Sequence, residues 1–541
     1  MKLIKEDLIK RRQIKGGKNI PIRKLTSAGY IQTKWINPFK QIKNDFNLKN
    51  LGLNIEFKTS QITEEAETII NIGNLYKKHP EYIEDKKNIS DGINEKTYKI
   101  KMKLPTGEKI VFVKKEYNDL SDKYLPALNN REILMRFITI ILKEEVLKGK
   151  DIKNIEDLKK EAKRNLQNIK RKINQFIQLI QKIPHLERAL NEIFYYSATK
   201  KIFPDVFVPP STILETDNKK TTFIQQFIQE DEELARYMKE YFFLTDEYIR
   251  KNGIFRIKMG IISLLKKSIK NPFEINEDVL RKINYKLIEL LNNLSEILEF
   301  LDVFTNYILD KNLDKIVAID LIFSHPDRHE KNYIYTKDKI IPIDNQLSNS
   351  FFQPFFHNPL TLFTNIGTEL YQLFFIIENL ISRIRNEFKD NEEFKRLYKI
   401  KELIKASGRT FIMLKYEPPY MNVYNSVKKA LSKKKELIKE YKQILKIIKE
   451  KKLYGENTNK IVKIKEKIFE NKLEILETLV NLGKQNFLDF LYNKILKIND
   501  SIISFTTSDS SISEIEHFNL YFLTPMNIIF YLALIKTLKE I

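Results

Sequence analysis

The sequence predicts a two-lobed α+β protein in which a small sheet precedes a larger helical part. Runs typical of strands lie between about residues 97 and 228, and from about 367 onward the apolar positions repeat at helical spacing. The length of 541 residues leaves room for about three domains. Few strands early and many helices late indicate an α+β architecture with a helical C-terminal extension.

The composition excludes several classes of protein. Apolar residues make up 42% and charged residues 30% of the chain, which is the balance of a folded protein and not of a disordered or fibrous one. Cysteine is absent, so the chain has no disulfide framework, thiolate metal site or cysteine nucleophile. No signal peptide is evident, and the apolar stretch 528–535 is too short to span a bilayer. We therefore expect a cytoplasmic protein without a transmembrane segment.

The net charge is strongly positive. Lys and Arg number 94 against 71 Asp and Glu, which gives +23 at pH 7. A solvated lysine-rich surface accounts for most of this charge, and an anionic partner, either nucleic acid or a membrane surface, is the alternative. Residues 1–60 hold 14 basic and 4 acidic residues. We interpret them as a basic N-terminal arm.

The first predicted strands form a hairpin. Residues 98–104 alternate between apolar and polar side chains, 105–108 have the composition of a turn, and 109–114 are β-branched in part. Helical periodicity follows over 154–183 and 189–202. Two more short strands are expected at 206–210 and 221–228, before helices resume over 232–310.

The most informative stretch, 317–348, is a strand–loop–strand block dense in polar groups. Transfer of a phosphoryl group from ATP needs a carboxylate near the acceptor hydroxyl and oxygen ligands for Mg²⁺. Asp327 suits the first role, and Asn332 and Asp344 suit the second. Arg328 and His329 are placed to order the loop or to contact phosphate. A polar turn without catalytic function is one alternative. A metal hydrolase that uses the neighbouring histidines is another, although Pro326 argues against one helical face.

This block resembles the catalytic core of atypical kinases, meaning the HipA-like serine/threonine kinases and the phosphatidylinositol 3/4-kinase group. Both have an Asp-Arg-His-x-x-Asn loop, here 327–332, and a metal-binding Asp shortly after it. The Ile-Asp-Asn of 343–345 is similar to the type II phosphatidylinositol 4-kinase-like branch, whereas Ser-His-Pro at 324–326 departs from the Asn or Gly often found there.

The resemblance implies a bilobal protein-kinase-like fold and sets the expected domain boundaries. These are the basic arm at 1–60, a sheet-containing N-lobe at 61–230 with a helical insertion at about 120–185, a helical C-lobe with the catalytic loop at 231–400, and a C-terminal helical extension at 401–541.

The resemblance also implies an ATP site upstream of the block. Gly92 and Asn94 precede the hairpin where the phosphate loop of the family lies. Residues 112–115 resemble the strand that presents the ATP-binding lysine, with Lys114 expected and Lys115 as the alternative. Gln226 and Phe227 lie where the hinge would bind adenine through its backbone.

The ATP-binding lysine of a kinase needs a glutamate partner from a helix. Glu192 is expected, because it precedes a Val-Pro-Pro sequence at 208–210 that resembles the step from this helix into the next strand in the family. Glu132, 18 residues after Lys114, is the alternative.

On these grounds we expect a kinase that uses ATP and Mg²⁺, with a protein Ser or Thr hydroxyl as the acceptor. An inositol lipid is the alternative acceptor. Outside the enzyme class, the alternative is a pseudokinase or scaffold that binds nucleic acid or protein through basic helices. The sequence indicates no oligomeric state.

Overall fold

The structure is a computed structural model, and it describes part of the chain. The described residues are 64–92, 95–121, 168–263 with gaps at 169–170, 173–174, 177, 181, 248–253, 255 and 259, then 275–325, 328–348, 359–492 and 525–540. All of them fall within one compact unit, 42–541. Several predictions lie outside the described residues, namely the arm at 1–60, most of the insertion at 120–185 with Glu132, and the site residues Asn94 and Asp327.

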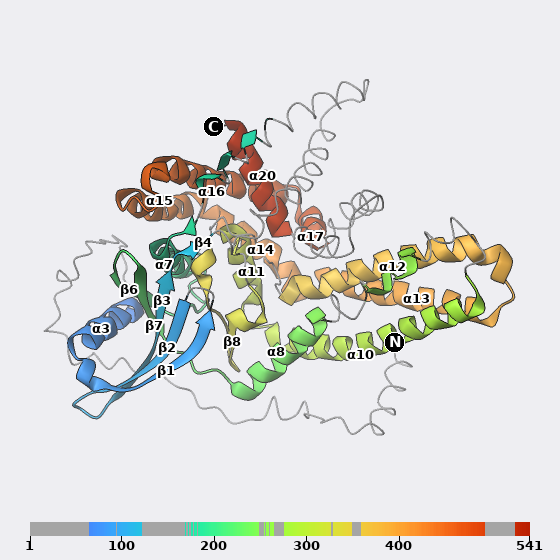
Figure 1. The fold of residues 1–541 in the computed structure, drawn as a ribbon, viewed down its shortest axis with the longest axis horizontal. Coiled ribbons are helices and arrows are strands. Elements are labelled where there is room, and N and C mark those ends of the chain that lie inside the picture. The colour runs from blue at the N-terminus through green and yellow to red at the C-terminus, as the bar shows by residue number, and fades with distance from the viewer. Residues whose placement is uncertain are drawn as a thin grey trace. The chain divides into compact units, whose positions relative to one another are not determined.

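The strands of the first part of the chain form a five-stranded antiparallel sheet (Figure 1). Their order in the sheet is β1-β2-β3-β7-β6, and the predicted hairpin is β2–β3. Gly107 adopts φ 86° in its turn, a conformation that favours glycine. The bounds of the strands are Ile83–Gly92 (β1), Glu95–Lys103 (β2), Lys109–Asn118 (β3), Ser211–Thr216 (β6) and Lys220–Gln226 (β7).

One strand begins later than predicted. The sequence favours a strand over 206–210, but β6 starts at Ser211, directly after Pro209 and Pro210. Proline has no backbone N–H to donate to a ladder, so pairing begins only once the prolines are passed. The carbonyl of Pro210 still accepts a hydrogen bond from the N–H of Gln226, at 3.0 Å.

The two faces of the sheet have different partners. Helix α3 (Glu64–Lys78) covers one face, where Phe112 meets Tyr76 edge-on with ring centroids 5.5 Å apart. The approach is close at Gly73, because a Cβ there would lie 2.7 Å from Cδ1 of Ile224. Helix α7 (His185–Ile202) lies on the other side of the sheet, where the hydroxyl of Tyr117 donates to Glu192 at 3.1 Å.

The chain after the sheet is mainly helical, as the sequence predicts. A two-stranded hairpin, β8–β9, follows α11 after a loop and η6, and an aromatic cluster joins α8, α10 and α12. The helices are α8 (Glu232–Glu247), α10 (Glu277–Ile308), α11 (Leu313–Phe323), α12 (Pro359–Phe388), α13 (Glu392–Met413), α14 (Pro418–Ser432), α15 (Lys434–Glu450), α16 (Thr458–Asn481), α17 (Lys484–Tyr492) and α20 (Pro525–Glu540). The remaining elements are β4 (Leu120–Ser121), β5 (Lys182–Ile183), β8 (Tyr333–Tyr335), β9 (Ile340–Pro342) and the 3₁₀ turns η2 (Pro80–Tyr82), η6 (Glu330–Asn332), η7 (Asn345–Leu347), η8 (Leu414–Tyr416) and η9 (Gly455–Asn457).

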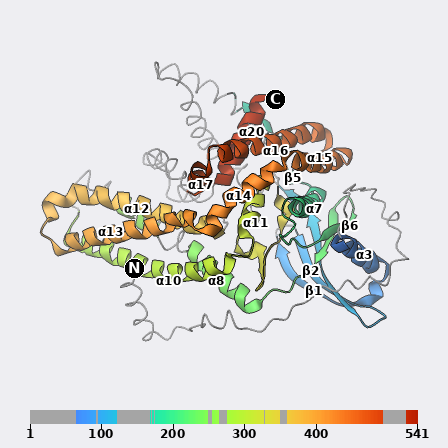
Figure 2. The ribbon, with the colours of Figure 1, turned by 180° about the vertical axis from the view of Figure 1, so that it is seen from behind.

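Helices α10, α12 and α13 lie side by side in both ribbon views (Figures 1 and 2). Among the described residues, one helical segment, Leu360–Phe388, has the length and apolar composition that a membrane span requires. However, 72% of its most apolar stretch is buried within the protein, as in a core helix. The described chain is therefore a mixed α+β protein with an N-terminal antiparallel sheet, which confirms the predicted class.

Candidate functional site

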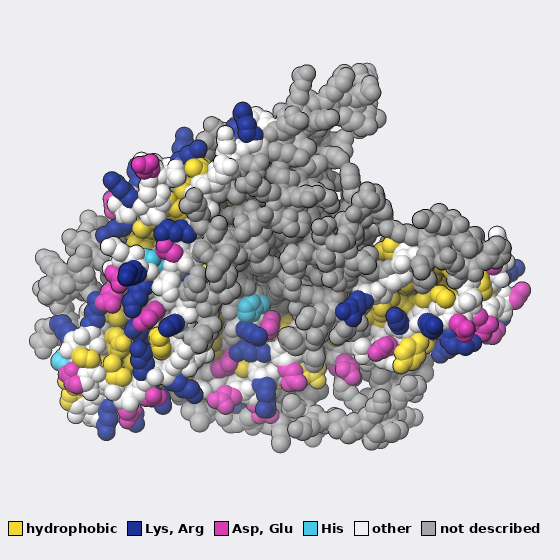
Figure 3. All heavy atoms as spheres, in the orientation of Figure 1, with side chains coloured by type: hydrophobic (Ala, Val, Ile, Leu, Met, Phe, Trp, Pro, Cys, Tyr) yellow, Lys and Arg dark blue, Asp and Glu magenta, His cyan; other side chains and the backbone are white. Residues whose placement is uncertain are grey.

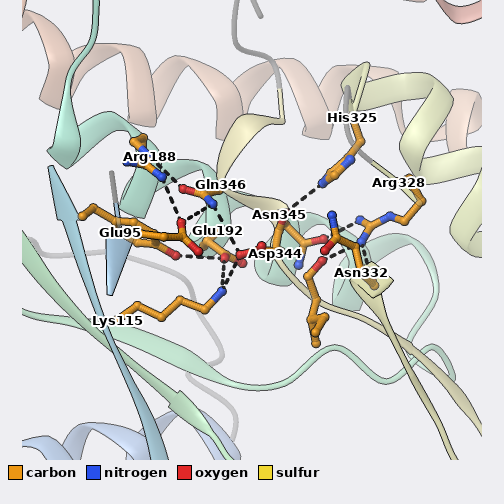
Figure 4. Close-up of polar contacts among 12 residues, drawn as sticks. Glu95, Lys115, Arg188, Glu192, His325, Arg328, Asn332, Asp344, Asn345 and Gln346 are labelled. Carbon is orange, nitrogen blue, oxygen red and sulfur yellow. Dashed lines mark hydrogen bonds and ion pairs between the residues drawn. The ribbon is translucent and has the colours of Figure 1, made fainter. Parts of the chain in front are cut away.

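Lys115 on β3 lies at the centre of a buried group of charged side chains (Figure 4). Its Nζ is 3.0 Å from Oε1 of Glu192 on α7 and 2.8 Å from Oδ1 of Asp344, which follows β9. The side chain of Lys115 is 6% exposed, and that of Glu192 is 1% exposed. Burial alone would lower the pKa of Lys115, but the two carboxylates raise it well above its usual value. The ammonium group is therefore held charged between two elements far apart in sequence.

The sequence predicts Lys114 as the partner of Glu192, and this prediction is wrong. The ion pair with Glu192 is made by the alternative residue, Lys115. Lys114 keeps the register of Phe112, and that register leads to the face covered by α3. Its Nζ lies 2.7 Å from Oε1 of Glu116 and 5.6 Å from the ring centroid of Tyr76. Two adjacent lysines therefore point to opposite faces of the sheet.

Asp344 is positioned by its own backbone and by His325. It adopts φ 62°, in the left-handed region, at the step from β9 into η7. Its carbonyl oxygen lies 3.1 Å from Nε2 of His325, which is fully buried. Burial and the nearby Arg328 lower the pKa of His325 well below its usual value, so the ring is neutral and donates from Nε2. Burial would raise the pKa of the Asp344 carboxyl, but Lys115 outweighs it and the net shift is downward.

Arg328 is fully buried, and it holds this part of the chain together. Its Nε and Nη2 donate to the two oxygens of the Asp320 carboxylate at 3.0 and 3.1 Å. Its Nη1 donates to the carbonyl oxygens of Asn332 at 3.1 Å and Ile343 at 2.7 Å. These hydrogen bonds to internal partners are those of a residue that orders the loop, which is one of the two roles that the sequence allows.

His329 precedes η6, and Asn332 is the last residue of η6. The ring Nδ1 of His329 accepts a hydrogen bond from the N–H of Lys331 at 3.1 Å. The carbonyl oxygen of Asn332 accepts from the N–H of Ile343 at 3.1 Å, directly beyond the last pair of the β8–β9 ladder. Because Ile343 precedes Asp344, the structure brings Asn332 and Asp344 to the same end of this hairpin.

The two residues at this end of the hairpin fit a magnesium ion by their chemistry. A carboxylate and an amide supply the oxygen ligands that Mg²⁺ prefers, and Mg²⁺ usually binds through one or two carboxylates together with phosphates and water. Within the described ranges, no group of three or more His, Asp and Glu side chains could hold a metal by itself. Asp344 and Asn332 would therefore be the protein's contribution there, alongside a phosphate-bearing substrate.

The expected adenine positions are divided between the two faces of the sheet, because Gln226 is opposite Phe112 and so shares the face covered by α3, whereas Phe227 contacts a residue of the face that carries Lys115. Gln226 ends β7, and the ring of the next residue, Phe227, lies 3.9 Å from Nζ of Lys99. Lys99 is opposite Val113 in the β2–β3 ladder, so it shares the face of Lys115. Gly92 pairs with Glu95 where β1 turns into β2, close in register to the charged cluster.

Three residues that the sequence reasoning missed complete the cluster, namely Glu95, Arg188 and Gln346. Arg188 donates to Oε2 of Glu95 at 2.9 Å and to Oε1 of Gln346 at 2.7 Å. Burial raises the pKa of Glu95 to about 7, and repulsion by Asp344 adds to the shift. One signal was available for Arg188, because it precedes Glu192 by one helical turn and so shares its face. The sequence held no comparable signal for Glu95 or Gln346.

Comparison with protein-family models, curated proteins and solved structures found no match to this chain.

Proposed function

We propose that this chain is a kinase that uses ATP and Mg²⁺ and has a bilobal protein-kinase-like fold. The observation that carries the proposal is the arrangement of Lys115, Glu192 and Asp344 around one buried ammonium group. In protein kinases, a lysine on the third strand pairs with a glutamate of the following helix, and a metal-binding aspartate must also be in place. Here Lys115 is on the third strand of the sheet, and Glu192 is on the helix that precedes the last two strands.

Each residue has a defined part in the proposed reaction. Lys115 contacts the ATP phosphates, and Glu192 keeps its ammonium group in place. The acceptor oxygen attacks the γ-phosphorus, the bond to the bridging oxygen breaks, and ADP leaves. Asp327 takes the proton of the acceptor hydroxyl. Asp344 and Asn332 would hold Mg²⁺, which would supply positive charge next to the phosphates.

Arg328 acts on this reaction only through other residues. Its hydrogen bonds join Asp320 at the end of α11 to the carbonyl groups of Asn332 and Ile343. It thereby fixes both strands at the end of the hairpin whose residues are proposed to bind the metal. Arg328 is a positioning residue in this proposal.

We favour a protein hydroxyl over an inositol lipid as the acceptor. Within the described residues, the one helical segment that is apolar enough to enter a bilayer is mostly buried against other helices. Its burial argues against a role for this helix in reaching a lipid acceptor. The proposal places the protein in the cytoplasm, where ATP is available.

The alternative outside the enzyme class is a scaffold that binds an anionic partner through basic helices. The lysines of α15 are partly matched by carboxylates, since Lys442 lies 2.9 Å from Glu466 and Lys434 lies 2.8 Å from Glu477. Basic and acidic side chains are also interspersed over the described part of the face in Figure 3. This distribution is typical of a solvated surface and favours the kinase proposal.

The test is phosphate transfer from γ-labelled ATP in the presence of Mg²⁺, with mixed protein and inositol-lipid acceptors. The intact chain is compared with Asp344→Asn, which keeps the shape of the metal ligand, and with Asp327→Ala. We expect label to appear with the intact chain and to disappear with both variants, and the labelled molecule identifies the acceptor. A folded intact chain that fails to bind ATP would refute the proposal. Label that persists in Asp344→Asn would refute the assigned metal ligand.

A further inference from the structure

Helix α7 makes specific contacts on two sides. On the side of the proposed site, Glu192 binds Lys115, Arg188 binds Glu95, and the side-chain amide of Asn191 donates to the carbonyl of Gln346 at 3.0 Å. These residues share one face because they lie three or four positions apart. Helix α15 lies beside α7 in both ribbon views (Figures 1 and 2), and other side chains of α7 contact α15 and α16.

A buried ion pair joins the first turn of α7 to α16. Oε1 of Glu187 lies 2.6 Å from Nζ of Lys465, and both side chains are 1% exposed. The second oxygen of Glu187 accepts a hydrogen bond from the hydroxyl of Tyr454, also at 2.6 Å. The carboxylate therefore has a partner on each oxygen, and both partners lie in the C-terminal extension. A buried pair of this kind tolerates little displacement, because separation would leave two charges without partners.

Two further contacts hold the middle and the end of α7. The ring of Phe194 lies 5.4 Å from that of Tyr441 on α15 and 6.2 Å from that of Phe469 on α16, measured between centroids. Near the end of the helix, Oε1 of Glu440 on α15 accepts from Ser197 at 2.9 Å and pairs with Lys201. The C-terminal extension thus contacts α7 over most of the length of the helix.

We propose that α15 and α16 are an internal positioning element for α7, and that Lys465 and Glu440 are positioning residues for Glu192. This inference rests on the proposed kinase function, in which the placement of the glutamate-bearing helix controls activity. An α-helix moves as a unit over a few turns, and Glu187 and Glu192 are five residues apart, about 7.5 Å along the axis. Displacing the first turn would therefore withdraw Glu192 from Lys115. The extension at 401–541 thereby acquires a function in the proposed reaction.

The experiment uses the full chain and three variants. Lys465→Met removes one charge of the buried pair. Glu187→Gln/Lys465→Met removes both charges and so relieves the unpaired carboxylate. Lys415→Met is the matched control, because Lys415 is also a buried lysine of the C-terminal extension, but its ion pair with Asp489 joins η8 to α17. Hydrogen–deuterium exchange of the amides of 185–202 reports the position of α7 without requiring activity, and the rate of phosphate transfer reports its consequence.

We expect Lys465→Met to raise amide exchange in α7 by about tenfold or more and to lower kcat/KM for ATP by a similar factor. In the double variant, the amide exchange of α7 and kcat/KM for ATP should both return to within about threefold of the intact chain. In the control Lys415→Met, both quantities should also stay within about threefold of the intact chain. Unchanged exchange in α7 of Lys465→Met, or an equal increase in the control, would overturn the inference.

A second variant keeps the inference testable if Lys465→Met does not fold. Glu440→Gln removes the charge that pairs with Lys201 but keeps a hydrogen-bonding side chain of the same size. It should raise exchange in the last turn of α7, and unchanged exchange there would contradict the positioning role. If the intact chain neither binds ATP nor transfers phosphate, the proposed function fails, whereas the exchange data still decide whether the extension holds α7.

Discussion

Arg328 illustrates how a residue in a loop of catalytic appearance serves the structure around it. Its guanidinium has five N–H donors and no acceptor, and a fully buried guanidinium must satisfy those donors inside the protein. Asp320, the side-chain oxygen of Asn345 and the carbonyl groups of Asn332 and Ile343 do so. The Asp-Arg-His motif therefore combines a proposed catalytic residue with a structural one.

Replacing Arg328 by Met should lower the free energy of unfolding by about 3–5 kcal/mol, because the buried carboxylate of Asp320 loses the positive charge that it pairs with and keeps the hydrogen bond from the hydroxyl of Tyr195. Urea denaturation followed by circular dichroism measures this. Arg281→Met is the control, since Arg281 makes ion pairs with Glu277 and Asp278 but its side chain is 59% exposed. Arg281→Met should alter the free energy of unfolding by no more than about 0.5 kcal/mol. Equal losses in the two variants would contradict the structural role of Arg328.

The pKa of Glu95 predicts a pH dependence of stability. In the folded protein this pKa is raised from 4.5 to about 7 by burial and by the charge of Asp344. The folded state therefore binds the proton more tightly than the unfolded state does. The stability contributed by this group is fully present below pH 4.5 and is lost as the pH rises through about 7. The loss amounts to about 3 kcal/mol at most.

Glu95→Gln should reduce the loss of stability between pH 5 and pH 7.5, because an amide does not titrate. The free energy of unfolding at both pH values, measured for the intact chain and the variant, checks this. Glu108→Gln, in the exposed turn of the same hairpin, is the control and should keep the pH dependence of the intact chain. Identical pH profiles for the intact chain and Glu95→Gln would show that Glu95 does not titrate in this range.

At this scale the sequence predicted residue types better than residue positions. The pattern before Val-Pro-Pro identified Glu192, which the structure places beside a lysine. It did not distinguish Lys114 from Lys115, because adjacent strand residues point to opposite faces and only the packing of α3 shows which face is covered. Glu95 and Gln346 could not be foreseen, since their contact joins segments 251 residues apart.

At the scale of elements, strands with an apolar face were predictable and β1 was not. The side chains of Asp85, Lys86 and Lys87 are exposed, so β1 has no run of apolar residues to reveal it. Its position depends on backbone pairing with β2 at the edge of the sheet. Charged side chains on an edge strand also discourage pairing with the strands of other chains. They are favourable because the strand lies at the edge of a sheet, and local strand propensity does not reveal that position.

The pairing of α12 with α13 depends on two glycines. A Cβ on Gly367 would lie 2.8 Å from the backbone nitrogen of Ile412 and 2.9 Å from the carbonyl oxygen of Gly408. Backbone atoms of a packed helix cannot yield as the end of a side chain can. Close approach of the two helices therefore requires glycine at this crossing.

Gly367→Ala should lower the free energy of unfolding by about 1–3 kcal/mol, through overpacking at this crossing. Gly260→Ala is the matched control, because Gly260 is helical and nothing lies within 4 Å of its would-be Cβ. Alanine favours a helix over glycine, so the control should gain about 0.5–1 kcal/mol. Thermal unfolding measures both. If Gly367→Ala and Gly260→Ala shifted the free energy of unfolding in the same direction, α12 and α13 would not approach each other as closely as described.

At the scale of the whole molecule, the α+β class and the order of sheet and helices followed from periodicity alone. The placement of the C-terminal helices against α7 did not, because the Glu187–Lys465 contact spans 278 residues. A single sequence carries no signal for a pair that distant. The proposed kinase therefore depends on a sequence motif for its chemistry and on long-range packing for the geometry of its site.

The measurement that tests the central claim most directly is ATP binding by two variants, Lys115→Met and Lys114→Met. Each variant is compared with itself in the presence and absence of ATP and Mg²⁺, so that any intrinsic loss of stability cancels. A ligand at a hundred times its Kd stabilises the folded state by about 2.7 kcal/mol, which thermal unfolding detects. The intact chain and Lys114→Met should show this stabilisation, and Lys115→Met should lose it. Retention of ATP binding by Lys115→Met, or its loss in Lys114→Met alone, would contradict the account.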